Sequence, residues 1–305
     1  MDTLVEIKAV TNDSGIADRA MNDAFEVIKD VEDGMSARKS GSLLDGIGKN
    51  SVGKSMKVPD ELFDIIEVCQ EYSRLTNGAF DISVNPVTRL WQFDQVEKDI
   101  PKEEDIKNAI KFVGYTGIHL DKENGTIELD REGMSLDLGG AAKGYAVDKA
   151  VEKLKESGIV AGIVNAGGDL RVFGKKPDGV PWNIGIQDPE NSEGVIATIQ
   201  LMDMALVTSG DYERYIVFNG IKYHHIIDPK TGQPARGCKS VSIAYMEAFD
   251  ADILSTAVFV MGPDEGMKLI ESMPGVEGMI VDASGRIQVS SGLKDRLKLH
   301  RNAVP

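Results

Sequence analysis

Two oxygen-bearing side chains, Asp252 and Thr256, stand four residues apart in an otherwise apolar run near the end of the chain. On a helix this spacing places both on one face, and a carboxylate with a hydroxyl suits a hard cation such as Mg²⁺. The same pattern fits an aspartate that complements the N-terminus of its helix and a threonine bonded to its own turn. The spacing alone favours this second, structural interpretation.

A second candidate is the glycine-rich stretch at residues 137–148, DLGGAAKGYAVD. Glycines let the backbone approach a ligand closely, and the N-terminus of the helix expected to follow offers N–H groups to an anion. Lys143 lies in the first turn of that helix, which Gly158 is expected to end. Taken alone, the stretch fits phosphate binding and tight packing equally well.

Two further polar turns are open to two interpretations each. His224 and His225 end an expected strand, where a histidine could accept the proton of a hydroxyl that does not ionise unaided. An ordinary strand-end histidine fits that position at least as well. Gly167 and Gly168 join two expected strands, either as a nest of N–H groups for a phosphate or as a plain hairpin.

The composition limits the classes of partner. The 305-residue chain carries a net charge of −15, which argues against nucleic acid and anionic membrane surfaces as main partners because phosphates would be repelled. A ligand that carries phosphates would therefore need local neutralisation by a metal ion, a lysine or backbone N–H groups. The two cysteines, Cys69 and Cys238, cannot supply a four-ligand zinc site, and single buried thiols are expected.

The order of the expected elements indicates an α+β fold in which helices pack on mostly antiparallel sheets. Helices are expected at residues 17–31, 59–76, 100–112, 142–157, 249–261 and 263–273. Strands are expected at residues 3–10, 118–120, 126–129, 159–165, 170–173, 182–187, 195–201, 205–208, 213–218, 222–227, 279–281 and 287–289. Residues 36–55 are expected to form a long mobile loop. The chain is expected to form a single catalytic unit, with a seam near residues 131–135.

Seven segments, taken together and in order, closely resemble the ApbE family of flavin transferases. Each motif is weak by itself, whereas seven in the same register along nearly the whole chain are specific. The segments are residues 1–3, 76–81, 137–148, 165–169, 208–214, 225–232 and 252–262. The resemblance implies a T-fold-like α+β architecture.

The resemblance also implies roles for particular residues. Asp252 and Thr256 resemble the family's metal ligands, helped by oxygens at Ser255 and Gly140, and His225 resembles its catalytic base. The implied contacts to FAD are Met1, Ala79, Phe80, Asp81, Asp137, Lys143 and Ile226, with Gly167 and Gly168 as further candidates.

Arg38 marks a departure from the family. Many relatives place an aromatic residue after the first helix, where this chain has Arg38. A guanidinium can also stack on a planar ring, so Arg38 is a further candidate for contact with FAD. The departure leaves open the balance between transfer of FMN and hydrolysis of FAD.

The function that the resemblance implies is that of a Mg²⁺-dependent FAD:protein FMN transferase. Such an enzyme moves the FMN phosphoryl group from FAD onto a threonine hydroxyl of a target protein, expected to be a redox or electron-transport subunit, and releases AMP. The alternatives are a Mg²⁺-dependent FAD pyrophosphatase that gives FMN and AMP, and a non-catalytic FAD carrier. Relatives are commonly exported or anchored as lipoproteins, but the printed sequence shows no signal peptide or lipobox, which leaves the compartment open.

Overall fold

A computed structural model describes residues 3–93 and 99–300 of the chain. The chain divides into two units. Unit 1 comprises residues 1–32, 141–210 and 237–305, and unit 2 comprises residues 33–140 and 211–236. The boundary nearest to the expected seam follows Gly140; the seam near residues 131–135 stays a prediction.

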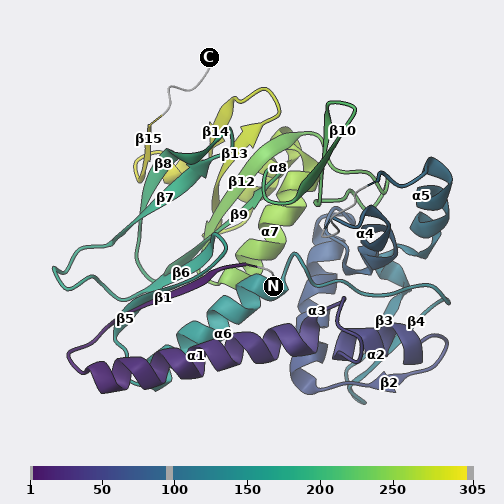
Figure 1. Cartoon of the computed structure of the whole chain (residues 1–305), viewed down its shortest axis with the longest axis horizontal. Helices are drawn as coiled ribbons and strands as arrows, with labels where there is room; N and C mark the ends of the chain where they lie inside the picture. Colours follow the sequence, from purple (N-terminus) through teal and green to yellow (C-terminus); the bar gives the residue numbers. More distant parts are fainter. Residues whose placement is uncertain (1–2, 94–98, 301–305) are drawn as a thin grey trace. The chain divides into compact units, whose positions relative to one another are not determined.

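Unit 1 is built on a seven-stranded sheet in which every neighbouring pair is antiparallel (Figure 1). In spatial order its strands are β1 (Val5–Val10), β5 (Ala161–Ala166), β6 (Asp169–Phe173), β9 (Met204–Gly210), β12 (Cys238–Tyr245), β13 (Glu277–Asp282) and β14 (Ile287–Val289). The antiparallel pairing confirms the expected α+β class rather than a ladder of parallel strands.

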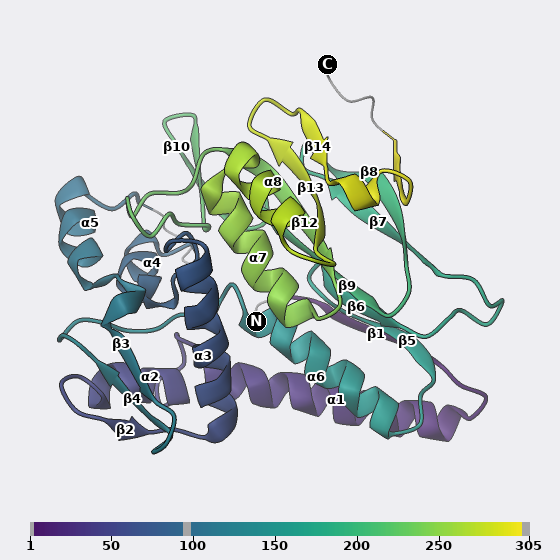
Figure 2. The ribbon, with the colours of Figure 1, turned by 180° about the vertical axis from the view of Figure 1, so that it is seen from behind.

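The two faces of this sheet are covered differently. A three-stranded sheet of β7 (Trp182–Asp188), β8 (Asn191–Leu201) and β15 (Leu297–Leu299) shares an apolar core with β6, β9, β12 and β13. The other face is covered by the helices α6 (Ala142–Glu156), α7 (Ala248–Met261) and α8 (Pro263–Ser272), which lie in front of the sheet in Figure 2. The short 3₁₀ helix η4 (Ser291–Leu293) packs against β13.

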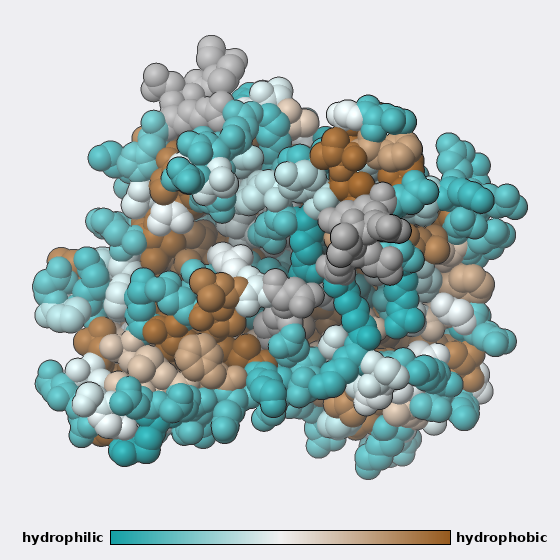
Figure 3. Space-filling view, in the orientation of Figure 1, coloured by the Kyte–Doolittle hydropathy of each residue, from teal (hydrophilic) through white to brown (hydrophobic). Residues whose placement is uncertain are grey.

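The long helix α1 (Ser14–Met35) is amphipathic: Ala20, Ala24, Ile28 and Val31 are buried. Figure 3 shows hydrophilic side chains along the outer side of this helix. That pattern is typical of a helix that buries one apolar stripe and leaves the opposite face in water.

Unit 2 contains four α-helices and two small sheets among its described residues. The helices are α2 (Leu43–Asn50), α3 (Asp60–Leu75), α4 (Asn85–Trp91) and α5 (Glu103–Ala109), with 3₁₀ turns η1 (Ile82–Val84), η2 (Ile110–Phe112) and η3 (Tyr115–Gly117). One sheet has the order β2 (Met56–Lys57), β4 (Thr126–Leu129), β3 (Ile118–Asp121), and the other is the hairpin β10 (Tyr215–Phe218) and β11 (Ile221–His224). A core around Val87, Trp91, Ile106, Ile216 and Ile227 joins α4 and α5 to the hairpin segment.

Several elements differ from the expectation, among them α4, β2 and β15, which were not expected. The supposed mobile loop at residues 36–55 contains α2, whose N-cap residue Ser42 accepts a hydrogen bond from the Asp45 N–H at 3.1 Å. Its glycines, Gly46 and Gly48, hide the helix in the sequence because glycine is a poor helix former. Strand β12, in the interior of the large sheet, was not expected at all.

Both cysteines are free and buried, as expected for single thiols. Among the described residues, no helix combines the length and the apolar composition needed to span a membrane.

Candidate active site

Helices α6 and α7 of unit 1 are in close contact at Gly144. A Cβ atom placed on Gly144 would lie 2.1 Å from the carbonyl oxygen of Ala248 and 2.9 Å from the Cβ of Asp252. Only a residue without a side chain fits there. The Lys143–Gly144 part of the glycine-rich motif is therefore a packing device, which supports the packing interpretation, and phosphate binding stays a prediction.

Asp252 lies on α7, which is apolar around its whole circumference and therefore buried. Only 3% of the residue is exposed, and its Oδ2 accepts a hydrogen bond of 3.0 Å from the Gly144 N–H in the first turn of α6. That turn has no side-chain cap of its own. Asp252 thus supplies a negative charge to a helix N-terminus across the α6–α7 contact, which is a favourable position for it.

Hydroxyl groups gather one turn further along α7. The Ser209 hydroxyl, on β9, lies 2.8 Å from the Ser255 hydroxyl and 3.4 Å from the Thr256 hydroxyl. The Ser255 hydroxyl also donates to the carbonyl of Asp252 at 2.9 Å. Unit 1 therefore brings Asp252, Ser255 and Thr256 together, and adds Ser209, which sequence reasoning did not single out.

Lys143 forms an ion pair with Asp169, the first residue of β6. Asp169 is fully buried, and burial raises the pKa of its carboxyl group against the opposing effect of Lys143. The ion pair with Lys143 offsets part of the cost of burying the Asp169 carboxylate. Sequence reasoning assigned Lys143 to FAD and missed Asp169, because nothing in the sequence indicates that these two residues meet.

Gly167 and Gly168 form the two-residue turn of the hairpin between β5 and β6. Their φ angles are +64° and +100°, which are the positive values that such a tight hairpin turn requires. Their N–H groups donate to the Leu4 carbonyl and to the Asn165 side chain at 3.0 and 2.9 Å. The structure supports the hairpin interpretation, and these two donors already have acceptors within the chain.

In unit 2, the two adjacent histidines have different environments. His224 is buried, its Nε2 bonds to the Ala235 carbonyl at 2.6 Å, and burial lowers its pKa. His225 is half-buried, and its Nδ1 lies 3.3 Å from the Arg214 carbonyl. Because a carbonyl only accepts, Nδ1 is the donor, and in the neutral ring Nε2 then carries the lone pair. His225 has the tautomer that a general base needs, whereas His224 is a core histidine.

The segment after α3 contributes three predicted residues, all of them buried: Ala79, Phe80 and Asp81. The Asp81 carboxylate accepts hydrogen bonds from the Ser83 N–H and hydroxyl at 2.8 and 2.6 Å, and from the Tyr115 N–H at 2.8 Å. Burial raises the pKa of Asp81, although these bonds act in the opposite direction. The carboxylate therefore fixes the local backbone.

The remaining predicted residues of unit 2 are more accessible, except Ile226. Asp137 is half-buried and accepts from the Thr88 hydroxyl at 3.1 Å and from the Gly139 N–H at 2.8 Å. Gly140 ends this segment, Ile226 is buried, and Arg38 is exposed in the turn between α1 and α2. Met1 lies outside the described residues.

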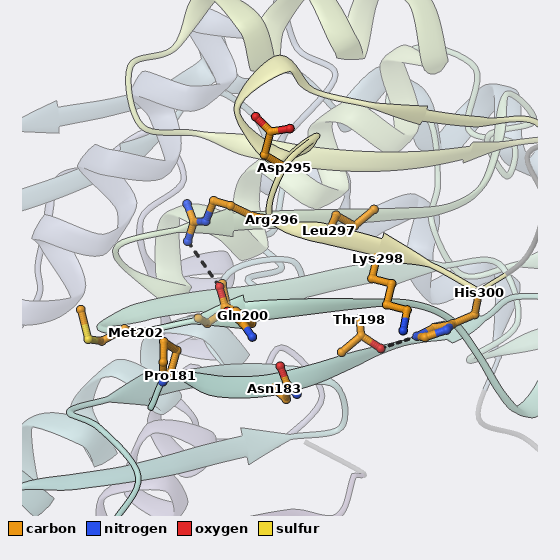
Figure 4. Close-up of a pocket in the computed structure, with 11 residues that line it drawn as sticks. Pro181, Asn183, Thr198, Gln200, Met202, Asp295, Arg296, Leu297, Lys298 and His300 are labelled. Carbon is orange, nitrogen blue, oxygen red and sulfur yellow. Dashed lines mark hydrogen bonds between the residues drawn. The ribbon is translucent and has the colours of Figure 1, made fainter. Parts of the chain in front are cut away.

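A cavity of about 750 Å³ in unit 1 contains none of the predicted site residues. Figure 4 shows its lining on β7, β8 and β15, with Asn183 and Gln200 opposite Arg296 and Lys298. All of its lining residues belong to these strands or to the segments beside them. The cavity is therefore distinct from the α6–α7 cluster.

The close approach at Gly144 gives a stability prediction. Gly144→Ala is expected to lower the free energy of unfolding by about 3 kcal/mol, because α6 and α7 would have to separate to admit a methyl group. Denaturant unfolding measures this change. Gly46→Ala is the matched control: a Cβ there meets only the Met56 methyl at 3.7 Å, so the alanine should stabilise α2 by up to about 1 kcal/mol. Equal stability of Gly144→Ala and the parent chain would contradict the packing argument.

Comparisons with known proteins agree with this fold. The model of the ApbE family matches residues 1–280. The FAD:protein FMN transferase of Vibrio cholerae serotype O1 is 33% identical over 89% of this chain and 82% of its own length. The protein of that name in Treponema pallidum is 30% identical over 92% of this chain and 82% of its own length.

Solved structures show the same architecture. The crystal structure of the ApbE protein from Thermotoga maritima superposes with a TM-score of 0.87 at 35% identity, covering 96% of this chain and 98% of that one. The flavin transferase ApbE from Vibrio cholerae gives a TM-score of 0.87 at 28% identity, with 97% and 96% covered. By sequence and by structure, the chain belongs to the ApbE family.

Proposed function

We propose that this chain is an FAD:protein FMN transferase that transfers FMN from FAD to a threonine hydroxyl of a target protein and releases AMP, with Mg²⁺ as its metal. The observation that carries the proposal is the extent of the match: relatives with that name align with most of the chain. The residue types that the reaction needs are intact, with a carboxylate and hydroxyls on α7 and a suitably oriented histidine at His225.

The donor set on α7 fits Mg²⁺ in its chemistry. Asp252 and Thr256 offer a carboxylate and a hydroxyl, the hard oxygen donors that Mg²⁺ prefers. The described residues contain no group of three or more His, Cys, Asp or Glu side chains suited to a metal. We therefore infer that Asp252 would be the one carboxylate to hold the ion, with the Thr256 hydroxyl beside it. When bound, the ion supplies positive charge against the diphosphate.

The chain's own residues then have separate tasks. The acceptor threonine Oγ attacks the phosphorus of the FMN half, the bond from that phosphorus to the bridging oxygen breaks, and AMP leaves with that oxygen. We assign to His225 Nε2 the proton of the attacking hydroxyl, since the bond from Nδ1 to the Arg214 carbonyl orients the ring. Lys143 adds positive charge that Asp169 partly balances, which makes its contribution to anion binding smaller than that of an unpaired lysine.

The test is AMP release from FAD with Mg²⁺, with and without a domain that carries an acceptor threonine, together with the mass of that domain. AMP that depends on the acceptor, and an acceptor heavier by one FMN less one water, support the transferase. AMP without any modified acceptor, across several candidate domains, supports a pyrophosphatase instead. Bound FAD without AMP would leave a flavin carrier and overturn the proposal.

A further inference from the structure

An acidic and basic cluster at the start of α7 has no role in the proposal so far. Asp148, on α6, accepts hydrogen bonds from the N–H groups of Ala248 and Phe249 at 2.9 and 2.8 Å. Its Oδ1 also accepts from the Arg171 guanidinium at 2.8 Å, and Arg171 in turn forms two bonds with Glu247. Asp148 is only 7% exposed. The Asp148 carboxylate is therefore buried and accepts three hydrogen bonds, so it is part of the protein interior and not an incidental surface contact.

These bonds form half of a reciprocal arrangement. Helix α7 has no side-chain cap of its own, and Asp148 from α6 takes the donors of its first turn. Helix α6 likewise has no side-chain cap, and Asp252 from α7 takes the Gly144 N–H. Each helix therefore caps the other. On α6 the two residues involved, Gly144 and Asp148, are four residues apart, and on α7 Ala248 and Asp252 are about one turn apart. The contact at Gly144 lies within the same interface.

We propose that Asp148 is a positioning residue for the transfer reaction, because it fixes the first turn of α7 on α6 and thereby sets the place of Asp252 one turn later. The inference rests on the proposed function, in which Asp252 anchors the metal. Asp148 does not touch the reacting atoms. Its carboxylate restrains both the rotation and the sliding of α7, since two neighbouring N–H groups bind its two oxygens.

The charge of Asp148 matters to this restraint. The charged side chains placed against it are Arg171 from β6 and Glu247 from the segment before α7. Burial raises the pKa of Asp148 to about 6, against the hydrogen bonds and Arg171. Protonation removes an acceptor and weakens the bond to Arg171, so turnover is expected to fall as the pH drops through about 6.

The effect on stability has the opposite sign. A carboxyl group whose pKa is higher in the folded state than in the unfolded state favours folding when protonated. That contribution is complete below the ordinary value of 3.8 and is lost as the pH rises through about 6. A loss of activity on acidification through Asp148 should therefore not be accompanied by a loss of stability through the same group.

The test uses Asp148→Asn in the full chain, with Glu152→Gln as a matched control. Glu152 lies exposed on the same helix, and its replacement removes the same charge. The asparagine amide cannot accept from both N–H groups and Arg171. We expect the Mg²⁺ concentration for half-maximal AMP release to rise about tenfold, and the acidic limb of the pH profile to become shallower, since protonation of the base His225 still contributes to it. Hydrogen exchange in the first turn of α7 should become faster in the metal-free protein.

Each outcome decides one question. An Asp148→Asn chain with the parent Mg²⁺ response, pH profile and hydrogen exchange overturns the positioning role, whereas a parent chain that releases no AMP overturns the proposed function instead. If Asp148→Asn does not fold, Arg171→Lys replaces it: the lysine keeps the charge but cannot hold Asp148 and Glu247 together. We expect a several-fold weaker Mg²⁺ response for that variant, and a response equal to the parent's contradicts the proposal.

Discussion

Replacing Asp252 by alanine is expected to lower Mg²⁺-dependent AMP release from FAD by at least about 10³-fold, because one substitution removes two interactions. Asp252 offers the carboxylate among the proposed ligands on α7. It also accepts the Gly144 N–H at 3.0 Å, so its loss leaves the first turn of α6 without that acceptor. The measurement is the rate of AMP release over a Mg²⁺ titration with saturating FAD.

One further variant separates these two interactions, and a second serves as its control. Asp252→Asn keeps the volume and an oxygen that can accept from Gly144, but lacks the charge that holds a cation. It should stay folded and lose the response to Mg²⁺. Asp264→Asn removes an exposed carboxylate from the first turn of α8 and should behave like the parent chain. Parent-level activity of Asp252→Asn at ordinary Mg²⁺ would exclude Asp252 from the metal site.

The helices on which this argument depends could be predicted from the sequence. Helix α7 follows a long apolar run that ends at Gly262 and Pro263, and α8 begins at that proline. Strand β12 was missed although its serines alternate with apolar residues as in a strand; what the sequence does not indicate is where those serines lie. In the structure those serines are buried, and Ser242 bonds to the Thr208 hydroxyl of the neighbouring strand at 2.8 Å. That partner is 34 residues distant in the sequence.

The candidate site shows the same limit. The proximity of Asp252 and Thr256 could be predicted, because residues four apart on a helix lie on the same face. Ser209, Asp169 and Arg171 are not, since each meets its partner through the pairing of strands and helices far apart in the chain. Asp148 stands in the glycine-rich stretch at residues 137–148, yet its partners Ala248 and Phe249 lie 100 and 101 residues away. The spacing of residues along a helix identifies candidate site residues, whereas the partners of those residues follow only from the fold.

His225→Ala is expected to keep FAD binding and to lower FMN transfer by about 10²- to 10⁴-fold, the usual effect of losing a positioned base. FAD affinity, measured by fluorescence, separates this loss from a loss of binding. The neighbouring histidine provides the control. His224→Ala removes a buried ring that bonds to the Ala235 carbonyl, and it should lower the free energy of unfolding by about 1–3 kcal/mol for the unpaired carbonyl alone.

The two histidines therefore predict opposite patterns from adjacent positions. Position 225 should affect transfer and leave the unfolding temperature nearly unchanged, because its ring is half-buried and bonds to one carbonyl at 3.3 Å. Position 224 should affect the unfolding temperature first. If His225→Ala transfers FMN at the parent rate, the proton must leave by another route and the tautomer argument fails. If it unfolds as readily as His224→Ala, the ring at 225 is structural, and the base must be sought elsewhere in the chain.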